Sequence, residues 1–171
     1  TMLRDGLIAL ALAASVVSAA WAADRLETVH SDKWTRDYDP HFRKYAKRYF
    51  GPHFDWRWFK AQAIAESRLD KRARSPVGAR GLMQLMPSTG RSTAKSERVR
   101  LPNTQALLQT DKNIRLGSAY LRKVLNRFQD NPVLATAAYN AGPHRVQRWL
   151  PDQTIQADQW AESIPFTETR G

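Results

Sequence analysis

The sequence predicts an all-α fold, or nearly so. Apolar residues recur with helical periodicity in several segments, which are separated by Gly-Pro or Pro breaks. No segment shows the sustained apolar-polar alternation of a strand, and no internal repeat is visible. A chain of 171 residues, of which 42% are hydrophobic, is long enough for one globular domain with its own core.

The N-terminal segment, residues 1–23, predicts a cleaved secretory signal peptide. Arg4 precedes an apolar run over residues 6–20, and the small residues that follow it resemble a cleavage site. The alternative is an uncleaved signal anchor in the inner membrane, because about 18 apolar residues just span a bilayer. Residues 24–39 are polar and aperiodic, and we expect them to form a lead-in with little structure.

The segment 42–50 predicts the first helix of the domain. Its apolar residues follow helical spacing on one face, so we expect that face in the core and the basic face in solvent. Gly51-Pro52 ends this helix, and Asp55 is placed to cap or charge the start of the next one. The apolar face consists of Phe42, Tyr45, Ala46, Tyr49 and Phe50, and the basic face of Arg43, Lys44, Lys47 and Arg48.

The helix over residues 58–66 is apolar around most of its circumference, which is typical of a helix buried on several sides. Glu66 is out of place there, because loss of water raises the pKa of a carboxyl group and favours its neutral form. Such a group can donate a proton near neutral pH. Alternatively, Glu66 lies on the exposed face beside Gln62, or it pairs with Arg68 or Arg72.

A glycine-punctuated loop follows at residues 75–81. Pro76 fixes φ, while Gly78 and Gly81 can adopt positive φ or let a ligand approach the backbone closely. Because this loop comes soon after Glu66, it is a candidate ligand-binding segment.

The elements beyond this loop are expected as follows. Residues 82–86 form a single apolar turn that Pro87 stops, and the polar, basic segment 91–105 is a loop with at most short helical pieces that forms one rim of a cleft. A long helix follows, capped by Thr110 or Asp111, with its apolar side at 114–128. The next helix spans 133–141, with Pro132 in its first turn and Gly142-Pro143 at its end. A helix over 144–150 and a short helix around Trp160 complete the chain.

The net charge of +11 indicates an anionic partner. The candidates are a cell-wall polymer with acidic peptides, an anionic membrane face and nucleic acid, but no nucleic-acid motif is present and a secretory signal argues against the last. The sequence predicts no metal and no cofactor. The four histidines lack the spacing of metal ligands, there is no cysteine, and no HExxH, GxSxG or phosphate-binding loop occurs.

Four short tracts together resemble the catalytic domain of soluble lytic transglycosylases, bacterial muramidases with a goose-type lysozyme-like fold. Each tract alone is weak evidence, but their order and spacing make a strong combined signal. The resemblance covers residues 40–171, and the segment 163–170 is similar to the branch of the family with a long helical superstructure. The four tracts are Glu66-Ser67, SPVGA at 75–79, GLMQLMP at 81–87 and AYNAG at 138–142.

The resemblance implies a lysozyme-like single domain with a two-lobed cleft, located in the periplasm. The implied partner is the peptidoglycan glycan strand, and a cell-envelope machine is a further candidate partner. The protein is expected to be a monomer and to bind no nucleic acid. The implied reaction cleaves the β-1,4 bond between N-acetylmuramic acid (MurNAc) and N-acetylglucosamine (GlcNAc) and forms 1,6-anhydroMurNAc. Members with the final tract continue into another helix, so we expect either a truncated C-terminus or a site that lacks one wall.

Ordinary glycosidases need two carboxylates, and the sequence offers Asp70, Glu97 and Asp111 beside Glu66, none of them convincing. The resemblance instead assigns Glu66 both roles, first general acid and then base. It also implies contacts for six further residues: Ser75 and Gln84 bind the sugar, Met86 lines the cleft, Tyr139 orients Glu66, Asn140 lies at the subsites, and Glu168 contacts the glycan or its peptide.

Two alternatives remain open on the sequence. A hydrolytic muramidase, that is a lysozyme, would use Glu66 with a water molecule in place of the C6 hydroxyl. A non-catalytic peptidoglycan-binding module would retain only the affinity for glycan.

Overall fold

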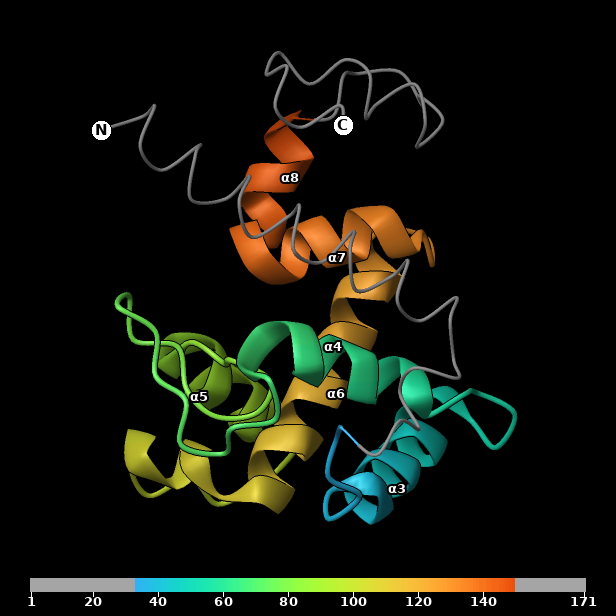
Figure 1. Ribbon diagram of the computed structural model, residues 1–171. Coiled ribbons are helices and arrows are strands. Elements are labelled where there is room, and N and C mark those ends of the chain that lie inside the picture. The colour runs from blue at the N-terminus through green and yellow to red at the C-terminus, as the bar shows by residue number, and fades with distance from the viewer. Residues whose placement is uncertain (1–32, 150–171) are drawn as a thin grey trace. The chain divides into compact units, whose positions relative to one another are not determined.

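The computed structural model describes residues 33–149. Within these residues, all the regular elements are helices. β-structure there is limited to two isolated bridges, Arg74 with Arg80 and Arg80 with Leu85. The predicted all-α fold is therefore confirmed. The elements in order are α3 (Asp39–Phe50), α4 (Arg57–Ser67), α5 (Pro87–Ser96), the short 3₁₀ helix η1 (Thr104–Leu108), α6 (Thr110–Arg127), α7 (Pro132–Ala141) and α8 (Pro143–Trp149) (Figure 1).

The described residues divide into two compact units, 33–122 and 123–149, with the boundary inside α6. None of the helices within 33–149 combines the length and the apolar character that crossing a bilayer requires. The predicted signal peptide, the predicted helix around Trp160 and the candidate residue Glu168 lie outside the described residues.

Helix α3 has the two faces that its sequence predicts. Phe42, Tyr45 and Ala46 are buried, and the basic residues of the other face are exposed. Gly51 ends the helix with φ at 92°, a conformation that glycine adopts without a steric penalty. The aromatic face is thus core.

Helix α4 packs against α3 (Figure 1). A buried ion pair, which the sequence did not predict, joins the two helices. Lys60 on α4 is fully buried, and its Nζ lies 2.7 Å from Oδ1 of Asp39. Asp39 is the first residue of α3, where the positive end of the helix dipole also favours a carboxylate. Lysine is almost never buried without a partner, so this pair fixes α4 at a defined position on α3.

The prediction of a loop over residues 91–105 is wrong in its first part, because α5 extends to Ser96. Pro87 ends the preceding apolar turn and also begins α5, since proline at the first helical position lacks only an N–H that would have no intrahelical partner. The buried face of α5 consists of Gly90, Thr93 and Ala94, which are too small to produce a strong apolar pattern. A Cβ atom at Gly90 would meet the Leu107 side chain at 2.8 Å, so this glycine lets α5 approach η1 closely.

Helix α6 anchors the segment between α4 and α5 through one buried amide. Asn113 is fully buried, and its Oδ1 accepts the Met83 N–H at 2.7 Å. Its Nδ2 donates to the carbonyl oxygens of Arg80 and Leu107 at 2.9 Å and 2.7 Å. Gly81 lies against the same side chain, since a Cβ there would come within 2.8 Å of Asn113 Cγ. Asn113 therefore supplies the partners that the backbone of this segment needs.

The unit at 123–149 consists of the end of α6 followed by α7 and α8, which pack on each other. Ala135 and Ala138 on α7 are fully buried, as is Val146 on α8. Gly142, with φ at 93°, ends α7, and Pro143 begins α8. The predicted helix after Pro132 and its termination at Gly142-Pro143 are confirmed.

We expect Asp39→Asn to destabilise the protein by about 3–5 kcal/mol, because the substitution leaves the Lys60 ammonium buried without a counter-charge. Chemical denaturation would measure the loss, with Asp37→Asn as the control because Asp37 is exposed. Adding Lys60→Met to Asp39→Asn should recover much of the stability. Equal stability of Asp39→Asn and the control Asp37→Asn would contradict the role of the ion pair.

We expect Asn113→Ala to destabilise the protein by roughly 2–4 kcal/mol, because one buried N–H and two carbonyl groups lose their partner. The matched control is Asn126→Ala, an exposed asparagine on the same helix that should change the stability by no more than about 0.5 kcal/mol. A similar small effect at both positions would show that the amide does not support this segment.

Candidate active site

Glu66 occupies the last turn of α4, a helix that is buried around its circumference. Five consecutive residues of this helix, from Phe59 to Ala63, are buried. Asp55 supports the start of the helix as predicted, because its Oδ1 accepts the Arg57 N–H at 3.0 Å. The helix ends at Ser67, after which Arg68 and Leu69 adopt positive φ of 54° and 61°.

The carboxyl group of Glu66 is in an environment that disfavours its charged form. The side chain is half-buried, and the protein around it removes most of the water from the carboxyl group. This desolvation raises the pKa of Glu66 to about 7, against a smaller opposing effect from a hydrogen bond with Gln62. Nε2 of the buried Gln62 donates to Glu66 Oε1 at 2.9 Å.

No cation offsets this desolvation among the residues that the structure describes. Arg68 and Arg72, the two candidates that the sequence offered, are exposed, and no ion pair with Glu66 forms within 33–149. Glu66 does lie beside Gln62, as the alternative interpretation of the sequence expected, but its carboxyl group is desolvated and not exposed. A carboxyl with a pKa about 7 is present in both protonation states near neutral pH, so it can donate a proton and later accept one.

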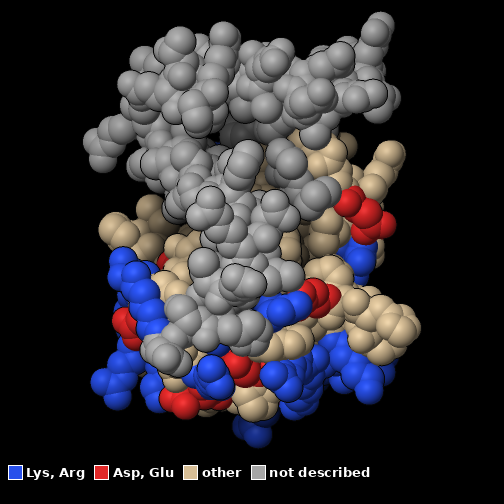
Figure 2. Space-filling model, turned by 45° about the vertical axis from the view of Figure 1, so that its right-hand side comes forward, with Lys and Arg blue, Asp and Glu red and all other residues tan. Residues whose placement is uncertain are grey.

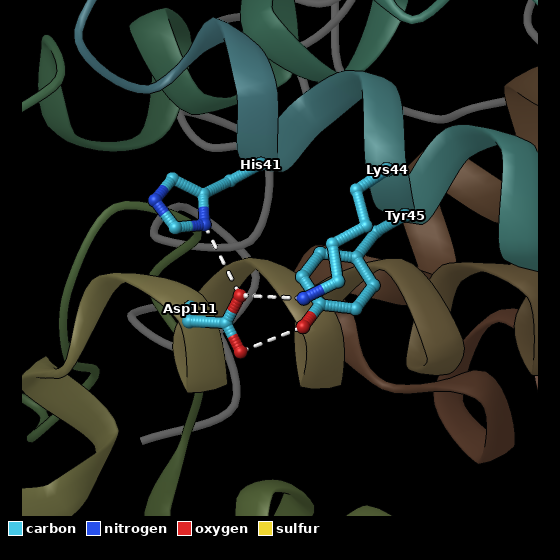
Figure 3. A network of polar contacts seen from close by, with 4 residues as sticks. All are labelled: His41, Lys44, Tyr45 and Asp111. Carbon is cyan, nitrogen blue, oxygen red and sulfur yellow. Dashed lines mark hydrogen bonds and ion pairs between the residues drawn. The ribbon is translucent and has the colours of Figure 1, made fainter.

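The other candidate carboxylates are engaged elsewhere. Asp70 is exposed and accepts the Arg72 N–H at 2.8 Å, and Glu97 accepts the Tyr49 hydroxyl at 2.7 Å. Asp111 lies at the start of α6 within a polar network with α3 (Figure 3). The partners in that network are Tyr45 Oη at 2.7 Å, His41 Nδ1 at 3.1 Å and Lys44 Nζ at 3.3 Å.

The network around Asp111 is that of a structural carboxylate. Partial burial acts to raise the pKa of Asp111, but the hydrogen bonds from Tyr45, His41 and Lys44 outweigh it and leave the pKa lowered. Asp111 thus stays ionised where Glu66 tends to be neutral. Burial thus raises the pKa of Glu66 toward neutrality, whereas the polar network lowers the pKa of Asp111.

The loop at residues 75–81 is closed by Ser75, one of the predicted sugar-binding residues. The Ser75 Oγ accepts the Ala79 N–H at 3.0 Å, and the Ser75 N–H donates to the Ala79 carbonyl oxygen at 3.0 Å. Gly78 completes the turn with φ at 93°. The hydroxyl of Ser75 keeps its own hydrogen, which is free to donate to a ligand.

Gln84 and Met86, two further predicted residues, follow on the next turn. Gln84 adopts a positive φ of 47°, and its Nε2 donates to the carbonyl oxygens of Gly81 and Ala73 at 2.9 Å and 3.3 Å. Its Oε1 remains as an acceptor. Met86 is 38% exposed and directly precedes α5. The amide donors of Gln84 are therefore used inside the protein, which the sequence pattern did not indicate.

This loop is tied to the end of α4 next to Glu66. Ser67 Oγ lies 2.8 Å from the Leu82 carbonyl oxygen and 3.0 Å from the Ala63 carbonyl oxygen, and its single O–H donates to one of them. Together with Asn113, Ser67 holds the loop in place. Both residues are polar groups at inward positions of a helix, and an inward polar residue in a periodic segment is the signal that would have found them.

Tyr139 and Asn140 belong to the unit at 123–149. Tyr139 is buried on α7, and Asn140 Nδ2 donates to the Thr136 carbonyl oxygen one turn earlier at 3.1 Å. Glu168 lies outside the described residues. Residues 33–149, which the structure describes, contain no group of three or more His, Cys, Asp or Glu side chains that would hold a metal ion.

Comparison with protein families gives one match, in which residues 42–161 fit the Transglycosylase SLT domain. A curated relative, the soluble lytic murein transglycosylase of Salmonella typhimurium, is 37% identical over 167 residues, which are 95% of this chain and 24% of the relative. The enzyme of that name from Escherichia coli K12 is 36% identical with the same coverage. The chain thus spans about a quarter of the length of these relatives.

Solved structures agree with this match. The lytic transglycosylase Slt of Pseudomonas aeruginosa, solved as an inactive Glu-to-Gln mutant, is 38% identical with a TM-score of 0.70 over 94% of this chain and 27% of its own. The 70 kDa soluble lytic transglycosylase in complex with bulgecin A is 38% identical with a TM-score of 0.68 over 78% of this chain and 22% of its own. With the helical fold and the family match in agreement, the chain belongs to the Transglycosylase SLT domain family.

Proposed function

We propose that this chain is a peptidoglycan lytic transglycosylase domain that cleaves the β-1,4 bond between MurNAc and GlcNAc and leaves 1,6-anhydroMurNAc. The observation that carries the proposal is the carboxyl group of Glu66, whose pKa burial raises to about 7. A relative at 37% identity is named a soluble lytic murein transglycosylase, and the Pseudomonas aeruginosa structure is that of a mutant inactivated by a Glu-to-Gln change. Both facts fit a single essential glutamate.

In the first step, the protonated Glu66 donates its proton to the glycosidic oxygen as the bond from that oxygen to C1 of MurNAc breaks. GlcNAc leaves with a hydroxyl group, and the 2-acetamido group of MurNAc stabilises the positive charge that develops at C1. In the second step, the Glu66 carboxylate accepts the proton of the C6 hydroxyl while O6 bonds to C1. The ring closes, Glu66 is protonated again, and no water is consumed.

The remaining site residues have supporting roles in this proposal. Ser75 offers a hydroxyl donor and Gln84 an amide oxygen for the sugar, and Met86 lines the site with an exposed apolar side chain. Tyr139 orients the Glu66 carboxyl group, Asn140 lies at the neighbouring subsites, and Glu168 contacts the glycan or its peptide. These last three roles rest on the resemblance of the sequence tracts.

The charge of the protein suits a wall polymer with acidic peptides. Figure 2 shows Lys and Arg side chains spread over the described part of one face, with fewer Asp and Glu among them, in line with the net charge of +11. The N-terminal signal would export the domain to the periplasm, either released by cleavage or held by an uncleaved anchor.

We expect Glu66→Gln to lower the release of muropeptides from purified sacculi by at least about 10²- to 10⁴-fold, because the amide cannot donate the proton. Mass spectrometry of the products from the full chain would test this and the chemistry together. The control is Asp70→Asn, which removes an exposed carboxylate four residues later and should leave the rate within about twofold.

The products separate the alternatives. Products that end in 1,6-anhydroMurNAc support the transglycosylase, whereas reducing ends would identify a hydrolytic muramidase. A Glu66→Gln loss of less than tenfold would refute the assignment of the acid. Glycan binding with no products from either protein would indicate a binding module.

We expect kcat/KM to fall as the pH rises through about 7, because the first step requires the protonated form of Glu66. The hydrogen bond from Gln62 lowers the pKa of Glu66, so Gln62→Leu should move this alkaline limb to higher pH. An unchanged limb in Gln62→Leu would mean that the titrating group is not Glu66.

Stability gives an independent check of the same pKa. Because the folded protein retains the Glu66 proton up to about pH 7 and the unfolded chain loses it near pH 4.5, stability falls with rising pH across this window. Glu66→Gln removes this dependence, so its stability relative to the parent protein should increase with pH in denaturation experiments over the same window. A constant difference between the two proteins would contradict the raised pKa.

A further inference from the structure

A basic cavity of about 590 Å³ lies in the unit at 33–122, beyond the end of α4. It is formed by the segment between Glu66 and Ser75 together with η1 and the start of α6. Its volume is in the range of small-molecule sites, roughly 300–1,000 Å³. The residues that line it are Lys71, Arg72, Arg74, Gln105, Leu108, Gln109 and Thr110.

The positive charge of this cavity is not balanced by its own lining. Lys71, Arg72 and Arg74 are exposed, and the lining contains no carboxylate. Within 33–149, none of these three cations forms an ion pair. The neighbouring Asp70 is directed at the backbone, where it accepts the Arg72 N–H at 2.8 Å. Three cations facing one cavity without counter-charges create a potential that attracts anions.

Two further features favour an oxyanion over a simple counter-ion. Arg74 is held in position because its Nη2 donates to Gln105 Oε1 at 2.7 Å, which leaves its other N–H groups available. Thr110 begins the long helix α6, whose dipole adds partial positive charge at this end. The carboxylate of Asp111 in the first turn is bound by Tyr45, His41 and Lys44 of α3.

We propose that this cavity binds carboxylate groups of the short acidic peptides that the glycan strand carries, and this rests on the proposed function. Carboxylates match the guanidinium and amide donors of the lining, and Leu108 offers an apolar contact for the aliphatic part of a peptide. The three cations at 71–74 lie in the short segment that connects the end of α4, where Glu66 is located, to Ser75. Recognition of the peptide is thereby linked to the loop that would bind the sugar.

Binding of free peptide tests this proposal without catalysis. The probe is the peptide mixture released from purified sacculi by an amidase, titrated against the full chain at low salt. We expect the triple variant Lys71→Gln, Arg72→Gln and Arg74→Gln to bind the peptides at least about tenfold more weakly. The matched control is Arg43→Gln, Lys47→Gln and Arg48→Gln, which removes the same three charges from the exposed face of α3 and should change the affinity less than about twofold.

The outcomes distinguish a peptide site from general electrostatics. Equal weakening in both triple variants would assign the binding to net charge and overturn the proposal. Inorganic phosphate that binds the cavity as tightly as the peptides would also overturn it, because the site would then be unselective. Peptide binding that survives in Glu66→Gln, with no muropeptide release by the parent chain, would retain this inference while the proposed function failed.

Substrate comparison gives a second test. On peptide-bearing sacculi, the Lys71, Arg72 and Arg74 triple variant should show a raised KM with kcat nearly unchanged. On glycan strands stripped of peptides by an amidase, it should match the parent protein. The same defect on both substrates would place these residues in glycan binding and contradict the peptide assignment.

Discussion

The structure depends on keeping one carboxyl group largely away from water. Residues Phe59 to Ala63 bury every side of α4, and the protein around the end of the helix removes most of the water from the carboxyl group of the half-buried Glu66. A helix buried in this way needs a fixed position, and the ion pair between Lys60 and Asp39 supplies it from the inside of the same helix. An ammonium without its partner would make the burial of α4 unfavourable. The raised pKa of Glu66 thus rests on an electrostatic contact elsewhere on α4.

The second requirement is a backbone of defined shape beside that carboxyl group. The segment from Ser75 to Met86 contains positive φ values at Gly78, Gly81 and Gln84, which no regular element would maintain. Its polar groups are therefore bonded to side chains from neighbouring helices, Asn113 on α6 and Ser67 on α4. Gln84 is the non-glycine residue among them, and this conformation costs such a residue on the order of 1–3 kcal/mol. It is therefore maintained only where surrounding contacts fix it. The Asn113 amide and the Ser67 hydroxyl therefore help to fix the conformation of this segment, together with the hydrogen bonds that Ser75 and Gln84 form within it.

The sequence predicts those parts of the fold where large apolar residues mark one face. Helices α3 and α6 are of this kind, whereas α5 buries only glycine, threonine and alanine and was missed. The raised pKa of Glu66 followed from one charged residue in an apolar run. The contacts of Asn113 and Lys60 were not predicted, because a polar residue at an inward helix position indicates burial only weakly and does not identify its partner. The role of Tyr139 toward Glu66 stays a prediction, since it joins residues of different units.

A protein with a net charge of +11 must also keep its cations from its acid, since a nearby positive charge would lower the pKa of Glu66. The left-handed turn after α4 contributes to this. Arg68 ends the helix at φ 54°, and its guanidinium carbon lies 6.0 Å from the centre of the Trp34 ring. The next cations, Lys71, Arg72 and Arg74, line a solvent-open cavity, where water screens them from a buried group. The same turn therefore separates a carboxyl group with a raised pKa from cations that remain available to an anionic ligand.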